Sequence, residues 1–541
     1  MLDIVRKDQG IQYTPTNLAD LLAIKLKYYS DNYFPEDKKI TILDPACGDG
    51  SLLKSIDKYF SNYKSIGIDL DITAIDKAKQ NLESTNTELI NMDYLDYFDK
   101  PVLDKTIDLI IANPPYIRNT VMGAARSQEL SSRFKIKGRL DMYQVFLQAM
   151  TENLRENGII CVITSNRYLT TKGGADTRKW LNENYKIFEI LDLGDTKPFS
   201  AAVLPAIFIG QKKKNANNNS VPFTRIYETN NSASTEAKSY PELLSSDSGI
   251  INFNGHNYEL IKGVLDASKN PKEVWNMATL EDNQWAKELE EHAKHKFDDV
   301  FKVHVGIKTT ADNVFIKKDW SDLPISERPE SPVLHNLISS KTITKWVQSD
   351  KKLLKILYTN KMENGKRTVI DFTKYPKAWN YLLNNKEQLA KRKYLKRANR
   401  EWYEIWVPQR PDIMSKNKVV FPDISPNAKF MYDNNGLFVD GNCYWITVKP
   451  NVDEKYLLLA TAVANSDVMQ KYHTIKFQNV LYSGRKRYIT QYVKEYLLPD
   501  IENTYSKKII ALMQSMLEEE KYNKKFEEKI NYYVQKCFEL K

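Results

Sequence analysis

The first 250 residues predict an α/β fold in which a largely parallel sheet is covered by helices on both faces. Strand-like apolar runs alternate there with helical patterns, as in sheets whose strands are joined by crossover helices. The first strand leads through Gly48 and Gly50 directly into a helix, the turn at which open α/β sheets bind ligands. Residues 251–541 carry mixed, irregular strand and helix signals, and their periodicity alone predicts no fold.

The elements of the first region are expected in a simple order. Strands are predicted at 39–46, 64–70, 87–91, 107–112, 158–164, 187–193 and 204–209, and helices at 51–60, 72–84, 142–154 and 177–184. Residues 221–228 predict one last edge strand. The following stretch, 229–249, is rich in Ser, Asn and Thr, so we expect domains at 1–250 and 251–541. Residues 507–540 have the spacing and charge of a surface or packing helix.

Charge is distributed unevenly along the chain. Its 541 residues include 79 Lys and Arg against 69 Asp and Glu, for a net charge of +10. Residues 1–250 have a net charge of −1, whereas the fifty residues from 351 to 400 hold 15 basic and 3 acidic side chains. Aromatic residues interleave this basic stretch, a pattern typical of nucleic-acid contact; the alternative is a solvated helix face. The predicted contacts are Lys391, Arg392, Lys393, Lys396, Arg397 and Arg400.

Several classes of protein are disfavoured. The four cysteines include no C-x-x-C pair, so we expect neither a metal site nor a disulfide framework. No apolar run reaches the roughly 18–20 residues that a membrane span requires. The N-terminus lacks the apolar segment of a secretion signal, which favours a cytoplasmic protein.

The turn in LDPACGDG predicts a nucleoside cofactor. Asp69 closes the next strand, at the place of an acid that holds ribose hydroxyls. Asp44 and Asp49 would repel a pyrophosphate, but they suit a nucleoside that carries a positive sulfonium. The pattern therefore indicates S-adenosylmethionine. Asp93, after the third strand, is placed to accept a hydrogen bond from the adenine amine of that cofactor; the alternative is a helix N-cap.

The sequence Asn113-Pro114-Pro115-Tyr116 follows an apolar strand. Two prolines cannot continue a strand ladder, so the chain must leave the sheet here in an extended conformation. The Asn113 amide oxygen and the Pro114 carbonyl are then two fixed acceptors beside an aromatic ring. Such a site suits an amine that loses a proton while it attacks a methyl group, with Tyr116 stacking on the ring that bears the amine.

With these motifs in order, the sequence resembles the gamma-class, TaqI-like N6-adenine DNA methyltransferases over nearly the whole chain. GIQYTPTNLADLL, LDPACGDG, GIDLD, MDYLDY and ANPPYIR match successive motifs of that family. KPFSAAVLPAIFIG matches the motif whose aromatic residue, here Phe199, stacks on the far side of an extruded base. VGIKTTADNVFI, YLKRANREWYEIW, KVVFPDIS and NCYWITVKP are similar to the recognition domain, except that Thr310 and Ala311 stand where a glycine is common.

The resemblance implies a Rossmann-like S-adenosylmethionine-dependent methyltransferase domain followed by a mixed α+β DNA target recognition domain. It implies methyl transfer to the N6 amino group of a flipped-out adenine in duplex DNA, as the modification enzyme of a restriction-modification system. A separate cognate endonuclease and a monomeric state are expected with it. The implied catalytic residues are Asn113, Pro114, Pro115, Tyr116 and Phe199; the implied cofactor residues are Thr14, Asp44, Ala46, Gly48, Asp69, Leu70, Asp93, Tyr94, Asn113 and Pro115.

Three alternatives remain open from the sequence. Asn-Pro-Pro-Tyr also occurs in methyltransferases that act on RNA guanine amines or on a protein glutamine amide. A DNA-binding component of a defence system could carry a silent methyltransferase site. A fused nuclease is the third possibility, but no convincing PD…ExK pattern is present, so we expect modification without cleavage.

Overall fold

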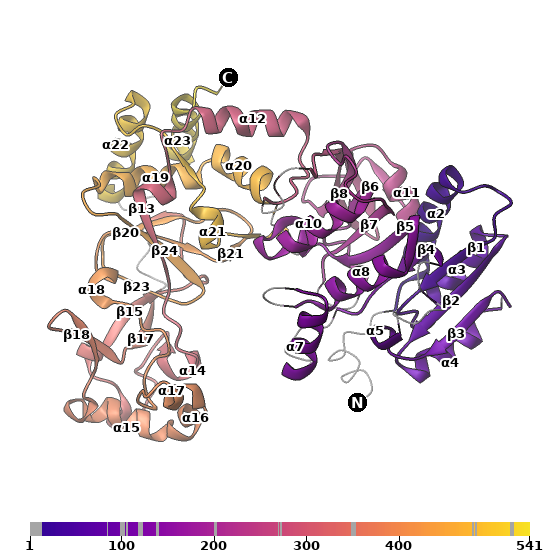
Figure 1. The fold of residues 1–541 in the computed structure, drawn as a ribbon. Coiled ribbons are helices and arrows are strands. Elements are labelled where there is room, and N and C mark those ends of the chain that lie inside the picture. The colour runs from indigo at the N-terminus through magenta and orange to yellow at the C-terminus, as the bar shows by residue number, and fades with distance from the viewer. Residues whose placement is uncertain are drawn as a thin grey trace. The chain divides into compact units, whose positions relative to one another are not determined.

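The computed structural model describes residues 13–83, 85–97, 103, 106–116, 123–136, 140–199, 203–268, 270, 273–347, 353–478, 481, 484–519 and 524–540. The chain forms two compact units, one of Met1–Asn283 with Phe477–Gly484 and the other of Gln284–Lys476 with Arg485–Lys541 (Figure 1). Among the described residues, no helix is both long and apolar enough to cross a membrane.

The first unit is built on a sheet of eleven strands in the order β3-β2-β1-β4-β5-β7-β6-β8-β11-β10-β9. The five strands from β3 to β5 are parallel, and β7 is antiparallel to both of its neighbours. The bounds are β1 Ile40–Asp44, β2 Tyr63–Asp69, β3 Thr87–Asn91, β4 Ile107–Ala112, β5 Leu154–Ser165, β6 Tyr185–Asp192, β7 Pro205–Lys212, β8 Val221–Glu228, β9 Thr235–Ala237, β10 Gly249–Phe253 and β11 His256–Leu265.

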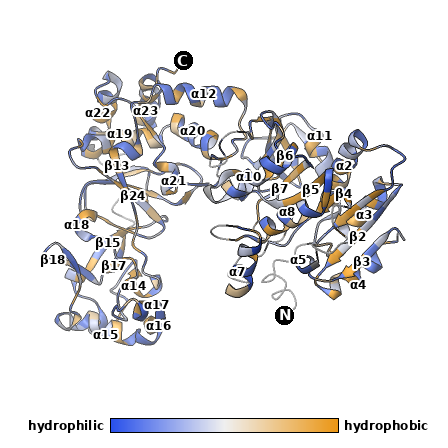
Figure 2. Cartoon of the chain, viewed as in Figure 1, coloured by the Kyte–Doolittle hydropathy of each residue, from blue (hydrophilic) through white to orange (hydrophobic). Residues whose placement is uncertain are grey.

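Helices cover both faces of this sheet, because successive strand residues point to opposite sides. Ile42 of β1 packs with α2 and α3 on one face, and the adjacent Leu43 packs with α8 and α10 on the other. Figure 2 shows apolar and polar stretches alternating along these helices, as expected for helices with one buried side. The bounds are α2 Thr16–Tyr33, α3 Ser51–Tyr59, α4 Ile72–Asn81, α5 Tyr94–Tyr97, α7 Ala124–Arg133, α8 Met142–Asn153, α9 Arg167–Thr170, α10 Ala175–Asn184 and α11 Tyr240–Ser245.

The sheet extends further than the sequence suggested. β8 is an interior strand rather than the expected edge, because β11 pairs with it along eight residues. β9 and α11 lie within the polar stretch that was expected to link two domains. The first unit accordingly continues to Asn283, beyond the boundary expected at Ile250.

The second unit has the expected mixed α+β character. One sheet has the order β13-β24-β20-β22-β16 and another β14-β17-β15-β23; β12 pairs with β26, β18 with β19, and β21 with β25. A buried ion pair joins Lys418 of β20 to Asp433 of β22. The predicted C-terminal helix forms two helices, α22 and α23. The strands are β12 His295–Lys296, β13 Phe301–Val305, β14 Ile316–Lys317, β15 Leu334–Ile338, β16 Trp346–Val347, β17 Leu354–Leu357, β18 Asn360–Glu363, β19 Lys366–Val369, β20 Lys418–Pro422, β21 Ile424–Ser425, β22 Met431–Asp433, β23 Phe438–Val439, β24 Cys443–Val448, β25 Lys486–Arg487 and β26 Leu497–Leu498.

The helices of the second unit lie around these sheets. Their bounds are α12 Leu280–Glu291, α13 Phe297–Val300, α14 Asp312–Phe315, α15 Pro376–Asn384, α16 Lys386–Ala390, α17 Lys393–Arg397, α18 Pro411–Met414, α19 Lys455–Asn465, α20 Asp467–Phe477, α21 Thr490–Val493, α22 Thr504–Glu519 and α23 Lys524–Cys537.

Candidate active site

The predicted site residues of the first unit gather at one edge of its sheet. β1, β2, β3, β4 and β5 run parallel, and β6 runs with them because both β5 and β6 are antiparallel to β7. The carboxyl ends of these strands therefore share an edge, and the chain order reverses between β1 and β4, where open sheets form a ligand crevice.

Asp44, at the carboxyl end of β1, is fully buried. Its Oδ1 accepts a hydrogen bond of 3.2 Å from the Ala46 backbone N–H, whereas its Oδ2 has no hydrogen-bond partner among the described residues. Burial raises the pKa of this carboxyl well above its usual range, and the neighbouring carboxylates Asp69 and Asp49 raise it further. A buried carboxylate of this kind suits a cationic ligand, which would supply the missing partner.

The turn after β1 brings backbone amides to Asp69. Gly48 has φ +55°, and its N–H donates a 2.8 Å hydrogen bond to Asp69 Oδ2, while the Asp71 N–H donates to Oδ1 at 2.9 Å. A Cβ on Gly48 would lie 3.1 Å from the Tyr13 ring, so a larger residue would crowd the turn. Each carboxylate oxygen retains capacity for a second hydrogen bond, so Asp69 is held in place and can still accept from ribose hydroxyls. These features fit a nucleoside cofactor.

Three further predicted cofactor residues lie near β2 and β3. Leu70 is 71% exposed, an apolar side chain available to a flat ring. The Tyr94 ring is buried, and its hydroxyl donates to Asn153 Oδ1 at 2.7 Å, which leaves only its backbone for a ligand. Asp93 accepts at Oδ1 from the Leu95 N–H, which makes it the cap of α5, and its Oδ2 lies 3.2 Å from Arg126 Nη2 of α7. Arg126 is a contact that sequence reasoning missed.

The N-terminal motif and the Asn-Pro-Pro-Tyr segment meet directly. Asn113 Nδ2 donates a 3.1 Å hydrogen bond to Thr14 Oγ1, and both side chains are buried. The bond orients the amide so that its oxygen faces away from Thr14. Pro114, beside it, is also buried, whereas Pro115 and Tyr116 are partly exposed.

Two aromatic rings stand beside Asn113. The Tyr116 and Phe199 ring centroids lie 6.0 Å apart at an interplanar angle of 52°. Phe199 comes from the connection between β6 and β7, so residues 83 positions apart in the sequence form one aromatic pair. A flat base between two rings at about 3.5 Å from each needs a centroid separation of roughly 7 Å, so a small opening and rotation would admit one.

A buried hydrogen-bond network supports the connection that carries Phe199. Asn166 Nδ2 donates to Asp192 Oδ1 at 3.0 Å and to the Tyr227 hydroxyl at 2.9 Å, and that hydroxyl donates to Asp192 Oδ2 at 2.9 Å. A Cβ on Gly194, which follows, would lie 1.9 Å from the Ile226 carbonyl oxygen, so the turn admits only glycine. The sequence offered no local signal for this network, because its members are far apart in the chain. Asn166 directly follows β5, Asp192 ends β6, and Tyr227 lies on β8.

Parts of three predicted motifs lie outside the described residues. These are Gly10, Ile11 and Gln12 of the N-terminal motif, Ile117 and Arg118 after Tyr116, and Ser200, Ala201 and Ala202 after Phe199. In the described part of the chain, no three His, Cys, Asp or Glu side chains are placed to hold a metal ion.

The basic residues of the second unit fall into two groups. Arg392 is only 7% exposed and donates to the backbone carbonyls of Leu389, Thr309, Glu404 and Trp402, so it is occupied by protein contacts. Arg400 pairs with Glu404 at 2.8 Å and donates to the Trp406 and Ile405 carbonyls. The predicted phosphate contacts therefore narrow to the four exposed cations, which are Lys391, Lys393, Lys396 and Arg397. Of these, Lys391 also lies 3.2 Å from Glu387.

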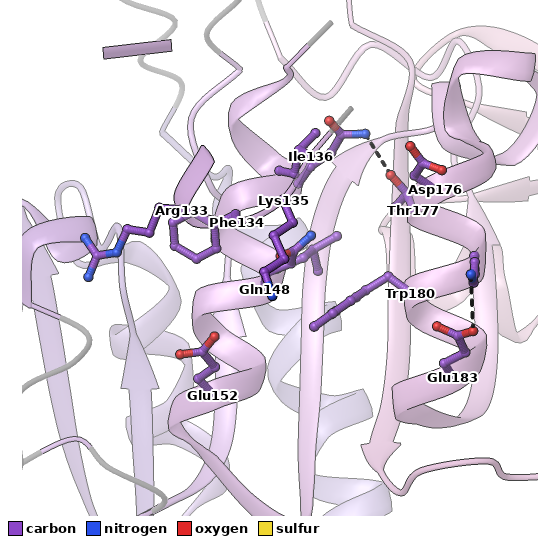
Figure 3. A pocket seen from close by; sticks show the side chains of 13 residues that line it. Arg133, Phe134, Lys135, Ile136, Gln148, Glu152, Asp176, Thr177, Trp180 and Glu183 are labelled. Atoms are coloured by element: carbon purple, nitrogen blue, oxygen red, sulfur yellow. Dashed lines mark hydrogen bonds and ion pairs between the residues drawn. The ribbon is translucent and has the colours of Figure 1, made fainter. Parts of the chain in front are cut away.

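A pocket of about 530 Å³ lies in the first unit, between the end of α7, α8 and α10. Figure 3 shows Trp180 of α10 extending toward the side chains of Lys135 and Gln148. Glu152 and Glu183 lie below Trp180 in this view. None of its lining residues belongs to the predicted cofactor or catalytic site.

The fold and the site together define an S-adenosylmethionine-dependent methyltransferase. The parallel sheet ends in an acidic crevice that fits a cationic nucleoside, and the crevice adjoins an Asn-Pro-Pro-Tyr segment with a second aromatic ring.

Comparison with known proteins identifies the family. Residues 25–199 match the Eco57I restriction-modification methylase model, and residues 363–499 match the TaqI-like C-terminal specificity domain. The type II methyltransferase M.BanIII of Aneurinibacillus aneurinilyticus is 43% identical over 95% of this chain and 93% of its own length. M.BstVI of Geobacillus stearothermophilus is 24% identical over 91% and 90%. The structure of the Type IIL restriction-modification enzyme MmeI in complex with DNA covers 100% of this chain and 75% of its own, with a TM-score of 0.63 at 14% identity, a likeness of fold.

The chain therefore belongs to the type II DNA methyltransferases of restriction-modification systems. Its substrate is DNA, and its methyl donor is S-adenosylmethionine. The predicted family resemblance, the fold class and the cofactor are confirmed.

Proposed function

We propose that this DNA methyltransferase modifies the N6 amino group of an adenine that is flipped out of duplex DNA. The observation that carries the proposal is the Tyr116 and Phe199 ring pair, 6.0 Å apart, in which Tyr116 follows the buried Asn113 by three residues. A duplex hides the amino nitrogen, so the base must leave the stack, at a cost of a few kcal/mol that stacking between two rings offsets.

Asn113 and Pro114 hold the amine in this proposal. An exocyclic amine is conjugated with its ring and is a poor nucleophile. Hydrogen bonds from its two protons to the Asn113 amide oxygen and the Pro114 carbonyl restore lone-pair density on the nitrogen. The Thr14 hydroxyl keeps the Asn113 amide in the required orientation through its 3.1 Å hydrogen bond. Alignment of two bound reactants can contribute several kcal/mol to the acceleration.

The cofactor residues act mainly by charge and orientation. S-adenosylmethionine supplies an electrophilic methyl group when it is bound. Asp69 would hold its ribose hydroxyls, Asp44 would attract its cationic amino-acid end, and the Leu70 side chain would pack on the adenine. Asp93 would accept from the adenine amine in addition to its contacts with the Leu95 N–H and Arg126, because each carboxylate oxygen can accept a second hydrogen bond. Ala46, Gly48, Tyr94 and Pro115 contribute backbone or packing contacts.

The second unit serves target recognition in this proposal, with phosphate contacts from its exposed cations. The proposed partners are duplex DNA and a separate cognate endonuclease, with the chain acting as a cytoplasmic monomer. Support comes from the specificity-domain match at 363–499 and from the restriction-modification family itself.

The target base can be tested directly. The purified protein is incubated with unmethylated duplex DNA and labelled S-adenosylmethionine, and the DNA is digested to nucleosides for chromatography. We expect label only in N6-methyl-2′-deoxyadenosine. Label in N4-methylcytosine would contradict the proposal, as would label in RNA or protein substrates but not in DNA.

Asn113→Ala provides the matched control for this assay. We expect its methylation to fall by at least about a thousandfold, since orientation and lone-pair activation are both lost. Its affinity for DNA and cofactor should stay close to that of the wild type, measured by fluorescence anisotropy and calorimetry. Retained turnover would contradict the catalytic assignment.

A further inference from the structure

The loop at 306–313 and the basic segment at 385–400 are joined by hydrogen bonds in the second unit. Arg392 donates to the Thr309 carbonyl at 3.0 Å, and the Tyr394 hydroxyl donates to Thr310 Oγ1 at 2.5 Å. These bonds join residues 83 and 84 positions apart in the sequence. We call the exposed part of this assembly the recognition platform: Thr310, Asn313, Gln388, Lys391, Lys393, Lys396 and Arg397.

An amide pair lies on the recognition platform. Gln388 Nε2 donates to Asn313 Oδ1 at 2.9 Å, and Asn313 Nδ2 donates back to Gln388 Oε1 at 3.4 Å. Both side chains are exposed. Each primary amide carries two N–H groups and an oxygen with two lone pairs, so the reciprocal bonds use only half of this capacity. The remaining donor and acceptor groups are held in a fixed relation to each other.

The backbone of the same loop is strained. Thr310 has φ +60°, a left-handed conformation that a β-branched residue adopts at a cost. Such conformations persist only where the surroundings enforce them, and they concentrate at functional sites. Here the enforcing contacts come from Arg392 and Tyr394 of the basic segment. The loop is thus held in one shape beside the amide pair.

The recognition platform carries exposed positive charges that suit contact with phosphates. Lys393, Lys396 and Arg397 are exposed, and α17 carries no acidic residue to offset them. Acidic groups nearby include Glu387, which pairs with Lys391, Asp312, which accepts from the Thr309 hydroxyl, and Glu404, which pairs with Arg400; Glu401 is exposed directly after Arg400. Lysine and arginine side chains bind the DNA backbone, whereas asparagine and glutamine amides bind either phosphates or the edge of adenine in the major groove.

We infer that Asn313 and Gln388 read base edges in the recognition sequence, while Lys393, Lys396 and Arg397 bind the adjoining phosphates. In the reciprocal pair each amide directs its oxygen and one N–H at the other amide, so the pair must open before one of them can donate to adenine N7 and accept from adenine N6 in the major groove. The amide that opens in this way would select an A·T base pair. This inference rests on the proposal that the second unit recognises duplex DNA.

The experiment compares three variants expressed in a host without DNA methylation. These are Asn313→Ala with Gln388→Ala, the triple variant Lys393→Ala, Lys396→Ala and Arg397→Ala, and Gln284→Ala as a matched control with an exposed glutamine on α12. Modified bases in the host DNA are sequenced, and purified proteins are titrated with specific and nonspecific duplexes at several salt concentrations. Thermal unfolding shows whether each variant is folded.

We expect the amide variant to accept other base pairs at one position, with discrimination reduced roughly tenfold to a hundredfold. Its affinity for nonspecific DNA should be unchanged. The triple variant should bind all duplexes more weakly, with its salt slope reduced by about one for each phosphate that is no longer neutralised. Gln284→Ala should behave as the wild type.

Three outcomes bear on the amide pair. An unchanged recognition sequence with unchanged methylation in the amide variant would overturn the inference. A uniform loss of affinity on all sequences would overturn it too, because the amides would then bind the DNA backbone. Complete loss of methylation with intact nonspecific binding would support it, and Asn313→Asp would then be expected to show the same loss. Unchanged salt dependence in the triple variant would instead refute the proposed DNA face of the second unit.

Discussion

Asp44 illustrates a conflict between stability and function at the scale of a single residue. Its carboxyl is fully buried, lies among other carboxylates, and has one oxygen with no hydrogen-bond partner among the described residues. An unpaired buried charge lowers the free energy of unfolding. Proteins retain such a charge where a ligand that binds later supplies its partner. The cofactor-free protein should therefore be less stable because of this residue.

We predict that Asp44→Asn raises the free energy of unfolding of the cofactor-free protein by about 1–3 kcal/mol at neutral pH. The folded-state pKa lies above the unfolded value of about 3.9, so the folded state binds the proton more tightly and loses stability as pH rises. The difference between variant and wild type should vanish near pH 3.5 and grow toward pH 8. Denaturant titrations at several pH values measure it, and calorimetry should show weakened cofactor binding.

Removing the Tyr116 hydroxyl tests whether Tyr116 acts only by stacking on the target base. The hydroxyl is buried and has no hydrogen-bond partner among the described residues, and burial raises its pKa well above the usual value, so it stays protonated. Stacking requires only the ring. We expect Tyr116→Phe to gain about 1 kcal/mol of stability and to keep kcat/KM within a few-fold, because an unmade buried hydrogen bond is removed.

Tyr116→Ala should lose most of its methylation, since the stacking surface is gone. A tenfold or greater loss in Tyr116→Phe, with binding unchanged, would show instead that the hydroxyl bonds the target base. Steady-state kinetics on a duplex with a single site distinguish the two results.

At the scale of elements, the connection from β6 to β7 carries Phe199 and depends on the Asn166, Asp192 and Tyr227 network. We predict that Tyr227→Phe lowers kcat by about tenfold with little change in the KM for DNA. The variant would position the Phe199 ring less well, and a rise of roughly 1.4 kcal/mol in the activation free energy is enough for a tenfold loss. A fluorescent base analogue at the target position should report weaker stacking in the flipped state.

Tyr185→Phe is the matched control for that change. Tyr185 is equally buried, and its hydroxyl bonds Thr151 at 2.7 Å, but it lies at the opposite end of β6. It should lose comparable stability without losing turnover. If both variants lose kcat equally, the network has only a structural role.

Elements formed by interactions between residues close in the sequence were predicted well, whereas those that depend on residues far apart were not. β3 and β4 have the bounds predicted from sequence, because an apolar run and its flanking turns define a buried strand locally. The interior position of β8 could not be predicted, because it depends on pairing with β11 across a polar stretch. The same holds for Arg392: its charge predicted DNA contact, and only tertiary packing shows its four carbonyl partners.

The candidate active site was more predictable than the proposed recognition platform. Asp44 and Asp69 end their strands and Asn113 directly follows its strand, so parallel topology alone brings the three residues to one edge. Their proposed roles stay predictions. Asn313 lies in the VGIKTTADNVFI segment, but Gln388 belongs to none of the predicted motifs. Their pairing joins residues 75 positions apart in the sequence, so only the folded chain reveals it.

At the scale of the whole molecule, the extent of the first unit decides where the chain can be divided. Cutting after Ile250 would separate β8 from β11 and remove an eight-residue antiparallel pairing from the middle of the sheet. It would also expose an unpaired edge rich in apolar residues, which promotes aggregation. A cut after Asn283 preserves the entire sheet.

We predict that a fragment ending at Asn283 unfolds cooperatively and binds S-adenosylmethionine within about tenfold of the full chain, whereas one ending at Ile250 aggregates. The longer fragment lacks residues 477–484, so the Met277 N–H loses its 2.9 Å hydrogen bond to Gln478 Oε1, at a cost of about 1 kcal/mol. Without the second unit it should methylate duplex DNA at no measurable rate under conditions in which the full chain turns over. Calorimetric unfolding, cofactor titration and a methylation assay on duplex DNA check these outcomes. Site-specific methylation by this fragment would mean that the first unit itself carries the recognition surface, and a cooperative, cofactor-binding fragment ending at Ile250 would show that β11 is dispensable to the sheet.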